Sequence, residues 1–246
     1  MTHRAASNRV LDTESLARVE GEGAMRVEIR DGEVHDVQLN IYEPPRFFEG
    51  FLRGRRFTEP PDITARICGI CPVAYQMSAC LAIEDALGVE VDGPIRDLRR
   101  LLYCGEWIES HTLHVHLLHA PDFFGVDSAI ELAATARAEV ERGLEIKKIG
   151  NDILETVGGR AIHPVNVKVG GFYRTPTRSE LTPLRAEVER GLEMAVDIVD
   201  FVAGFDFPDQ VMDYEFVATG HPTEYPILGT RIVSDRGLDI DVSAFT

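Results

Sequence analysis

The centre of the sequence, from Val73 to about residue 204, consists mainly of segments that carry the spacing and end signals of α-helices. The first segment runs from Val73 to Leu87 and stops at Gly88, a residue type that ends helices in the left-handed conformation. The second begins at Pro94, a favourable first helical residue, and extends to about His119. Its apolar residues recur at helical spacing: Ile95, Leu98, Leu102, Ile108 and Val115. The chain must therefore fold around packed helices.

Two further helices are predicted by capping boxes, in which Ser or Thr is followed three residues later by Glu. Ser128 and Glu131 predict a helix over about residues 128–157, and Thr177 and Glu180 predict one over about 178–204. Two other stretches are predicted to be extended: Ala161–Val169, which ends at Gly170-Gly171, and Tyr225–Val233.

The N-terminal part shows the two-residue period of a β-strand. Apolar residues alternate with charged ones from Met25 to Ile29, and apolar residues recur at every second position from Val37 to Ile41. Between them lies Asp31-Gly32, a pair that accepts positive φ in a tight hairpin turn. We therefore predict an α+β fold, with an N-terminal β-hairpin or small sheet followed by a mainly helical core of long helices. The Pro- and Gly-rich passages are short, so residues 1–246 are expected to form a single piece.

Charge and composition exclude several classes of function. The chain has 25 Lys and Arg against 41 Asp and Glu, a net charge of −16 that repels polyanions and disfavours nucleic-acid binding. Residues 1–23 contain no apolar signal-peptide core, and no run of about 18 apolar residues occurs, so no membrane span is expected. Four cysteines in a chain of this length form no disulfide framework, which suits a reducing, cytoplasmic compartment.

The sharpest local motif is Cys68-Gly69-Ile70-Cys71, on the turn that leads into the first predicted helix. At this spacing two sulfurs converge on one soft metal ion, and amide groups at the helix N-terminus favour thiolate. The spacing alone leaves three alternatives open: half of a zinc site, a thiol–disulfide couple, or two cysteines that only pack. The chain has no second C-x-x-C pair and no thioredoxin-like strand–helix–strand context.

The flanking residues distinguish between these alternatives. The segment Arg66–Pro72, which reads RICGICP, resembles the first cysteine motif of the large subunit of nickel–iron hydrogenases. Other segments resemble the same family in the same order: Arg18–Gly23, Arg46–Glu49, Ser110–His114, Ala120–Phe123 and Gly158–Phe172. The residues around Cys71 and Pro121 are most similar to the cytoplasmic, pyridine-nucleotide-linked class, called bidirectional hydrogenases or sulfhydrogenases.

The resemblance implies a metal centre. In the family, four thiolates from two C-x-x-C pairs hold nickel, and two of them bridge to an iron that carries carbon monoxide and cyanide. By position, Cys68 would be a terminal nickel ligand and Cys71 a bridging one. Glu20 matches the glutamate that first relays the proton; without the resemblance it would be interpreted as a surface carboxylate.

Two further positions could bind metal. Glu49 matches the family's glutamate for a hard cation, usually magnesium, and a carboxylate suits such an ion; the alternative is a partner for a neighbouring arginine. His111 and His114 share a helix face and could chelate a metal, but core packing with hydrogen bonding is the preferred interpretation.

The main departure from the family is a missing motif. Family members carry a second cysteine motif, Asp-Pro-Cys-x-x-Cys-x-x-His, near their C-terminus, whereas no cysteine follows Cys104 here. We therefore expect residues 1–246 to be the N-terminal portion of a large-subunit-like domain, incomplete for catalysis by itself.

The resemblance implies reversible oxidation of molecular hydrogen, coupled through the iron–sulfur clusters of a small subunit to NAD(P). Flavin- and NAD(P)-binding diaphorase subunits are further expected partners. Two alternatives remain: a non-catalytic hydrogenase-like scaffold subunit, and a C-x-x-C zinc or redox module. The presence of both Cys68 and Cys71 argues against the scaffold.

Overall fold

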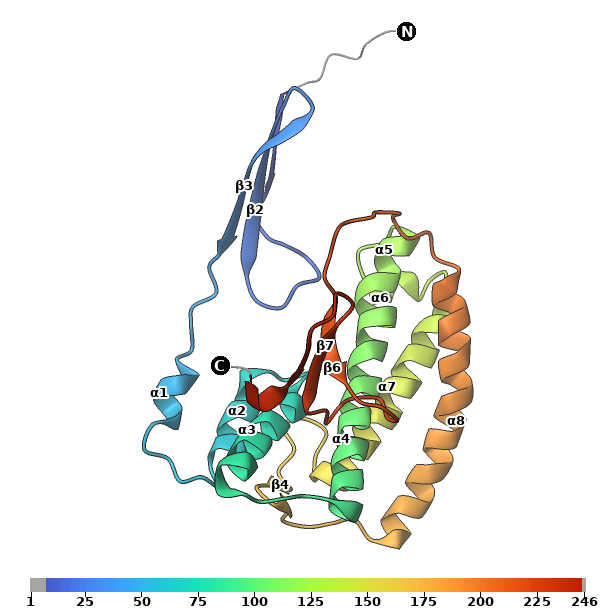
Figure 1. Ribbon diagram of the computed structural model, residues 1–246. Helices are drawn as coiled ribbons and strands as arrows, with labels where there is room; N and C mark the ends of the chain where they lie inside the picture. Colours follow the sequence, from blue (N-terminus) through green and yellow to red (C-terminus); the bar gives the residue numbers. More distant parts are fainter. Residues whose placement is uncertain (1–7, 245–246) are drawn as a thin grey trace. The chain divides into compact units, whose positions relative to one another are not determined.

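The computed structural model describes residues 8–244 and divides into two compact units, one up to Gly50 and one from Phe51 onward (Figure 1). The two units are described separately. Whether they form the single piece predicted from the sequence stays a prediction.

The first unit is a three-stranded antiparallel sheet in the order β1-β2-β3. Its strands are β1 (Arg9–Thr13), β2 (Gly23–Arg30) and β3 (Glu33–Ile41). The predicted hairpin is confirmed, since Asp31 and Gly32 turn the chain with φ of 53° and 87°. In register, Met25 pairs with Leu39, so the alternating apolar residues of both strands share one face. Strand β1 was not predicted.

The second unit is mainly helical. Its long helices are α3 (Pro72–Leu87), α4 (Gly93–Thr112), α7 (Arg137–Gly158) and α8 (Arg178–Ala203). The short helical segments of the chain are α1 (Phe48–Leu52), α2 (Pro60–Thr64), η1 (Ala65–Ile67), the π-helical η2 (Leu113–His119), α5 (Ala120–Phe124), α6 (Ala129–Leu132) and η3 (Val242–Ala244). None of the helices within residues 8–244 combines the length and apolarity needed to cross a membrane.

Two small antiparallel sheets complete the second unit. The first pairs β4 (Val167–Lys168) with β5 (Gly171–Phe172), and the second has the order β6 (Val217–Gly220), β7 (Arg231–Ser234), β8 (Asp239–Asp241). The predicted α+β class with a mainly helical core is confirmed.

Three of the four predicted helices match closely. Gly88 ends α3 with φ of 65°, Thr177 and Glu180 form the capping box of α8, and α4 continues into η2 up to His119. The continuous helix over 128–157 is wrong, because Ser128 caps only α6 and Ala136 leaves helical geometry at φ −129°. This break lets Leu132 and Val140 enter the same buried cluster.

The predictions of extended chain are largely wrong. Within Ala161–Val169 only β4 is a strand, because the chain wraps around the end of α7, where the N–H groups of Val165 and Asn166 both donate to Gly158 O. Of the predicted stretch Tyr225–Val233, only the end belongs to β7, and β6 was not predicted.

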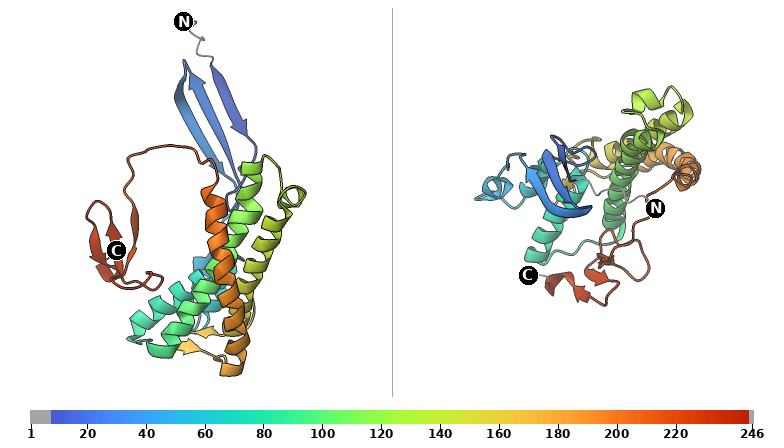
Figure 2. Two further views of the ribbon diagram at one scale, coloured as in Figure 1. Left: turned by 90° about the vertical axis from the view of Figure 1, so that its right-hand side faces the viewer. Right: turned by 90° about the horizontal axis from the view of Figure 1, so that it is seen from above.

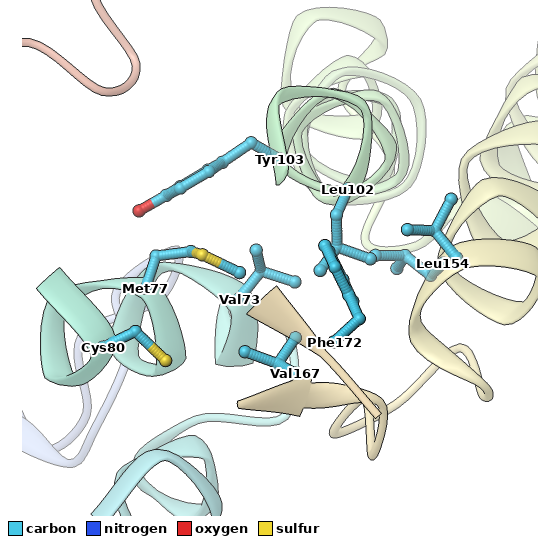
Figure 3. Packing of buried hydrophobic residues seen from close by; sticks show 9 residues of the cluster. Val73, Met77, Cys80, Leu102, Tyr103, Leu154, Val167 and Phe172 are labelled. Carbon is cyan, nitrogen blue, oxygen red and sulfur yellow. The ribbon is translucent and has the colours of Figure 1, made fainter. Parts of the chain in front are cut away.

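The core of the second unit lies where α3, α4 and α7 meet the β4-β5 hairpin. Figure 3 shows Val73 and Met77 of α3, Leu102 of α4 and Leu154 of α7 packed together with Phe172 of β5. The long helices α4, α7 and α8 lie side by side (Figure 2), and α7 is seen between the other two in Figure 1. This core fixes the start of α3, and therefore the turn that carries the two cysteines of the motif.

Candidate metal centre

The Cys68–Cys71 turn connects η1 to α3. Cys68 is extended, with φ −140° and ψ 144°, and Cys71 is the residue immediately before the first turn of α3. Both side chains are half-buried, and their Sγ atoms lie within 4.8 Å of each other. Thiolates bind soft divalent ions at about 2.3 Å, so two on one ion are at most about 4.6 Å apart. The pair can therefore chelate one ion with little side-chain movement.

Backbone amides of the turn itself face Cys68. The N–H groups of Ile70 and Cys71 each donate to Cys68 Sγ at 3.3 Å. These two hydrogen bonds hold the Cys68 sulfur against the backbone of the turn. The amide donors expected near the helix N-terminus are therefore those of Ile70 on the turn and of Cys71, the N-cap residue of α3.

The first-turn N–H groups of α3 donate to Glu106 of α4, from Val73 at 2.5 Å and from Ala74 at 3.2 Å. Glu106 is only 2% exposed, and burial raises the pKa of its carboxyl group to about 7, although the two amide bonds oppose the shift. No sequence motif marked Glu106, because its partners are more than 30 residues away along the chain.

The far side of the turn is held by the segment that follows α7. His163 Nδ1–H donates to Ala65 O at 2.8 Å, and Gln76 Nε2 donates to Pro164 O at 2.6 Å. His163 has a positive φ of 50°, which is uncommon for a residue with a side chain. The segment Gly158–Phe172 was noted only for its resemblance; the structure shows that part of it braces the residues on either side of the cysteines.

The other two cysteines have different surroundings. Cys80 lies in the core at 0% exposure, and burial raises the pKa of its thiol to about 12. Burial also raises the pKa of Cys104. Both remain neutral thiols at pH 7, and neither lies on the turn of the C-x-x-C motif.

The two glutamates of the predicted site belong to the first unit. Glu20 and Glu49 are both exposed; Glu20 precedes β2 and Glu49 lies in α1. Their roles as proton relay and cation ligand stay predictions.

The expectation of core packing is wrong for His111, which is exposed and lies 5.6 Å from the ring of Trp107. His114 is half-buried, and its Nδ1–H donates to Ser110 O at 3.1 Å.

Comparison with known proteins identifies the family. The family model described as nickel-dependent hydrogenase matches residues 46–151, which include the Cys68–Cys71 turn. The sulfhydrogenase 2 subunit alpha of Pyrococcus furiosus is 42% identical over 194 residues, covering 79% of this chain and 47% of that protein. The chain belongs to the nickel-dependent hydrogenase family.

Other hydrogenases support the same conclusion. Sulfhydrogenase 1 subunit alpha of the same organism is 39% identical over 180 residues, covering 73% of this chain and 42% of that protein. The crystal structure of an NAD⁺-reducing [NiFe]-hydrogenase in the H₂-reduced state superposes with a TM-score of 0.74 at 28% identity, covering 96% of this chain and 56% of that chain. The chain thus spans about half the length of the curated hydrogenase subunits it matches.

Proposed function

We propose that this chain is part of a nickel–iron hydrogenase large subunit that oxidises molecular hydrogen reversibly. Support comes from one observation above all: in a chain of the hydrogenase family, two half-buried cysteines on a braced turn bring their sulfurs within 4.8 Å of each other. Soft thiolates are suitable ligands for a nickel centre that changes redox state.

In this proposal Cys68 and Cys71 would hold a nickel–iron centre with carbon monoxide and cyanide on its iron, Cys68 as a terminal ligand of nickel and Cys71 as a bridging one. Two thiolates supply half of a four-thiolate centre, so the other two come from outside residues 1–246 and the chain is incomplete for catalysis by itself. When bound, the centre supplies the redox chemistry that splits hydrogen heterolytically.

Two carboxylates have supporting roles. Glu20 accepts the proton released by hydrogen cleavage and passes it toward solvent, and its exposed position suits that exchange. Glu49 binds a hard cation such as magnesium through its exposed carboxylate. Both assignments rest on the places of these residues in the Arg18–Gly23 and Arg46–Glu49 segments.

The partners follow from the relatives. The curated relatives are named as alpha subunits, and the solved neighbour is described as NAD⁺-reducing. We propose an iron–sulfur-containing small subunit as the electron acceptor of this chain, and flavin- and NAD(P)-binding diaphorase subunits beyond it. Four cysteines in a chain of this length suit a cytoplasmic location.

Metal analysis of the native complex tests the proposal. The complex is purified without oxygen through a tag on this chain, and its nickel, iron and zinc are quantified together with its infrared spectrum. Nickel and iron in equal amounts, with bands from carbon monoxide and cyanide, are expected. Zinc alone would favour a C-x-x-C zinc or redox module, and absence of metal would favour a non-catalytic scaffold.

Variants assign the ligands. Cys68→Ser and Cys71→Ser should each remove nickel and abolish hydrogen turnover, because a hydroxyl is a poor ligand for a soft ion. The matched control is Cys104→Ala, a half-buried cysteine of α4 whose raised pKa keeps it a neutral thiol. Full nickel content in Cys71→Ser would rule out the assigned role of this residue.

A further inference from the structure

Glu106 lies in the middle of α4 but bonds to the start of another helix. Its two carboxylate oxygens accept separate hydrogen bonds, Oε2 from Val73 N–H at 2.5 Å and Oε1 from Ala74 N–H at 3.2 Å. The side chain is 2% exposed, so water contributes little to this contact.

The first turn of α3 depends on this carboxylate. Helices begin with N–H groups that have no partner within the helix, and a side chain at the N-cap usually supplies one. Here the N-cap residue is Cys71, whose side chain does not cap the helix, and the next residue is Pro72, which has no N–H. Glu106 therefore caps α3 by direct hydrogen bonds, although it lies more than 30 residues further along the chain.

The same geometry determines the backbone on both sides of Cys71. On one side its own N–H donates to Cys68 Sγ at 3.3 Å. On the other side Glu106 holds Val73 and Ala74, two and three residues further on. With Pro72 rigid between them, the direction in which Cys71 projects its Sγ depends on where Glu106 holds α3.

We infer that Glu106 is a positioning residue that fixes the start of α3 so that Cys71 Sγ shares one soft metal ion with Cys68. This inference deepens the proposed function and rests on Cys71 being a metal ligand. Residues that orient ligands in this way typically contribute 10–100-fold to metal affinity.

The buried carboxylate is costly for stability, which fits a positioning role. Burial opposes its ionisation, and an apolar side chain of similar size would pack between α3 and α4 without that penalty. An apolar side chain would however leave the two amides of α3 without an acceptor.

Cadmium binding to this chain, with no nickel or iron present, tests the inference. The affinity is measured from the sulfur-to-cadmium charge-transfer absorption, and amide hydrogen exchange is followed at Val73 and Ala74. Glu106→Leu should weaken cadmium binding by about 10–100-fold and remove protection at both amides. Glu109→Gln is the matched control: Glu109 lies one turn along α4, is 6% exposed, and pairs with Lys147 instead of α3.

Two conservative variants distinguish the reach of the Glu106 side chain from its negative charge. If Glu106→Leu does not fold, these two variants alone test the inference. Glu106→Gln keeps the reach and one acceptor oxygen for the shorter bond, from Val73 N–H, so it should retain more cadmium affinity than Glu106→Leu. Glu106→Asp keeps the charge but is one methylene shorter, so it should bind as weakly as Glu106→Leu.

The opposite ranking, with Asp near wild type and Gln weak, would show that charge matters and would overturn the inference. Loss of amide protection in Glu106→Leu with unchanged cadmium affinity would overturn it too, because the residue would then only cap the helix. If the native complex contains no nickel while these variants behave as expected, the proposed function fails and the positioning role of Glu106 stands.

Discussion

Glu20 is the residue whose proposed role is easiest to separate from metal binding. It is exposed and precedes Gly21, whose φ of 87° directs the chain into β2. A glutamine in its place keeps the shape but cannot carry a proton. Glu20→Gln should therefore leave nickel and iron bound in the complex while the rate of H₂/D₂O exchange falls by about 10²–10⁴-fold.

Exchange is measured by mass spectrometry of the gas phase. Glu22→Gln, two residues further on and also exposed, is the control and should exchange at the wild-type rate. Undiminished exchange in Glu20→Gln would remove this residue from the relay.

The buried ion pair between Arg99 and Glu84 stabilises the packing of α3 against α4. The two side chains form paired bonds of 2.8 and 2.6 Å, and Glu84 Oε1 also accepts from Gly170 N–H at 2.6 Å. Removing one partner of a buried pair leaves the other charge without compensation, which costs about 3–5 kcal/mol. Glu84→Gln should lower the free energy of unfolding in urea by this order.

Glu224→Gln is the control for this prediction. Glu224 also bonds to arginines, with Arg96 at 2.7 Å and Arg100 at 2.9 Å, but its side chain is 32% exposed. A pair open to solvent contributes about 0–1 kcal/mol. Equal losses in the two variants would contradict the importance of burial.

At the level of elements, glycines set the distance between helices. Gly105 of α4 faces Gly150 of α7, and a Cβ at Gly150 would lie 2.6 Å from Glu109 N and 2.8 Å from Gly105 O. Backbone atoms cannot rotate away, so Gly150→Ala must push α4 and α7 apart, at a cost of about 1–3 kcal/mol. Thermal unfolding measures the effect.

The control is Gly204→Ala at the end of α8. Its φ is −82°, and an added Cβ would meet only Phe201 O at 3.4 Å. The free energy of unfolding of this variant should lie within about 0.5 kcal/mol of the wild-type value, as expected for a substitution away from tight contacts. Wild-type stability in Gly150→Ala would show that the helices can separate freely.

Elements whose signals are local were predictable from the sequence. The ends of α3 and α8 depend on Gly88 and on the pair Thr177 and Glu180, which act within one helical turn. The break before α7 was not predictable, because it serves the burial of Leu132 in a cluster that includes Ala120 and Val140. Local capping signals do not reveal where an apolar cluster formed by several elements will interrupt a helix.

In the candidate metal centre, too, the residues with local signals were predictable from the sequence and those with distant partners were not. Spacing and resemblance predicted Cys68 and Cys71, because both lie in one short motif. The residues that hold the turn come from far along the chain: Glu106 from α4, and His163 from the segment after α7. A single sequence carries no record of such contacts, so only the folded structure shows them.

At the level of the whole molecule, Glu106 links stability to pH. The carboxyl group in the unfolded chain ionises near its ordinary pKa of 4.5, whereas burial raises the pKa in the folded chain to about 7. Between these values the folded state holds a proton that the unfolded state has lost, so the free energy of unfolding falls as pH rises. In the same pH range His116 and His163 act in the opposite direction, since burial lowers the pKa of each.

Comparison with Glu106→Gln isolates the contribution of this carboxyl group, because both histidines remain in the variant. The gap between pKa values of 4.5 and about 7 corresponds to roughly 3 kcal/mol. Relative to wild type, Glu106→Gln should therefore gain about 3 kcal/mol of stability between pH 4.5 and pH 7, and no more above that range. Urea unfolding at a series of pH values measures this difference. If the difference in free energy of unfolding between wild type and Glu106→Gln does not change with pH, the prediction is contradicted. Glu106 would then ionise at the same pH in the folded and unfolded chains, despite its burial between α3 and α4.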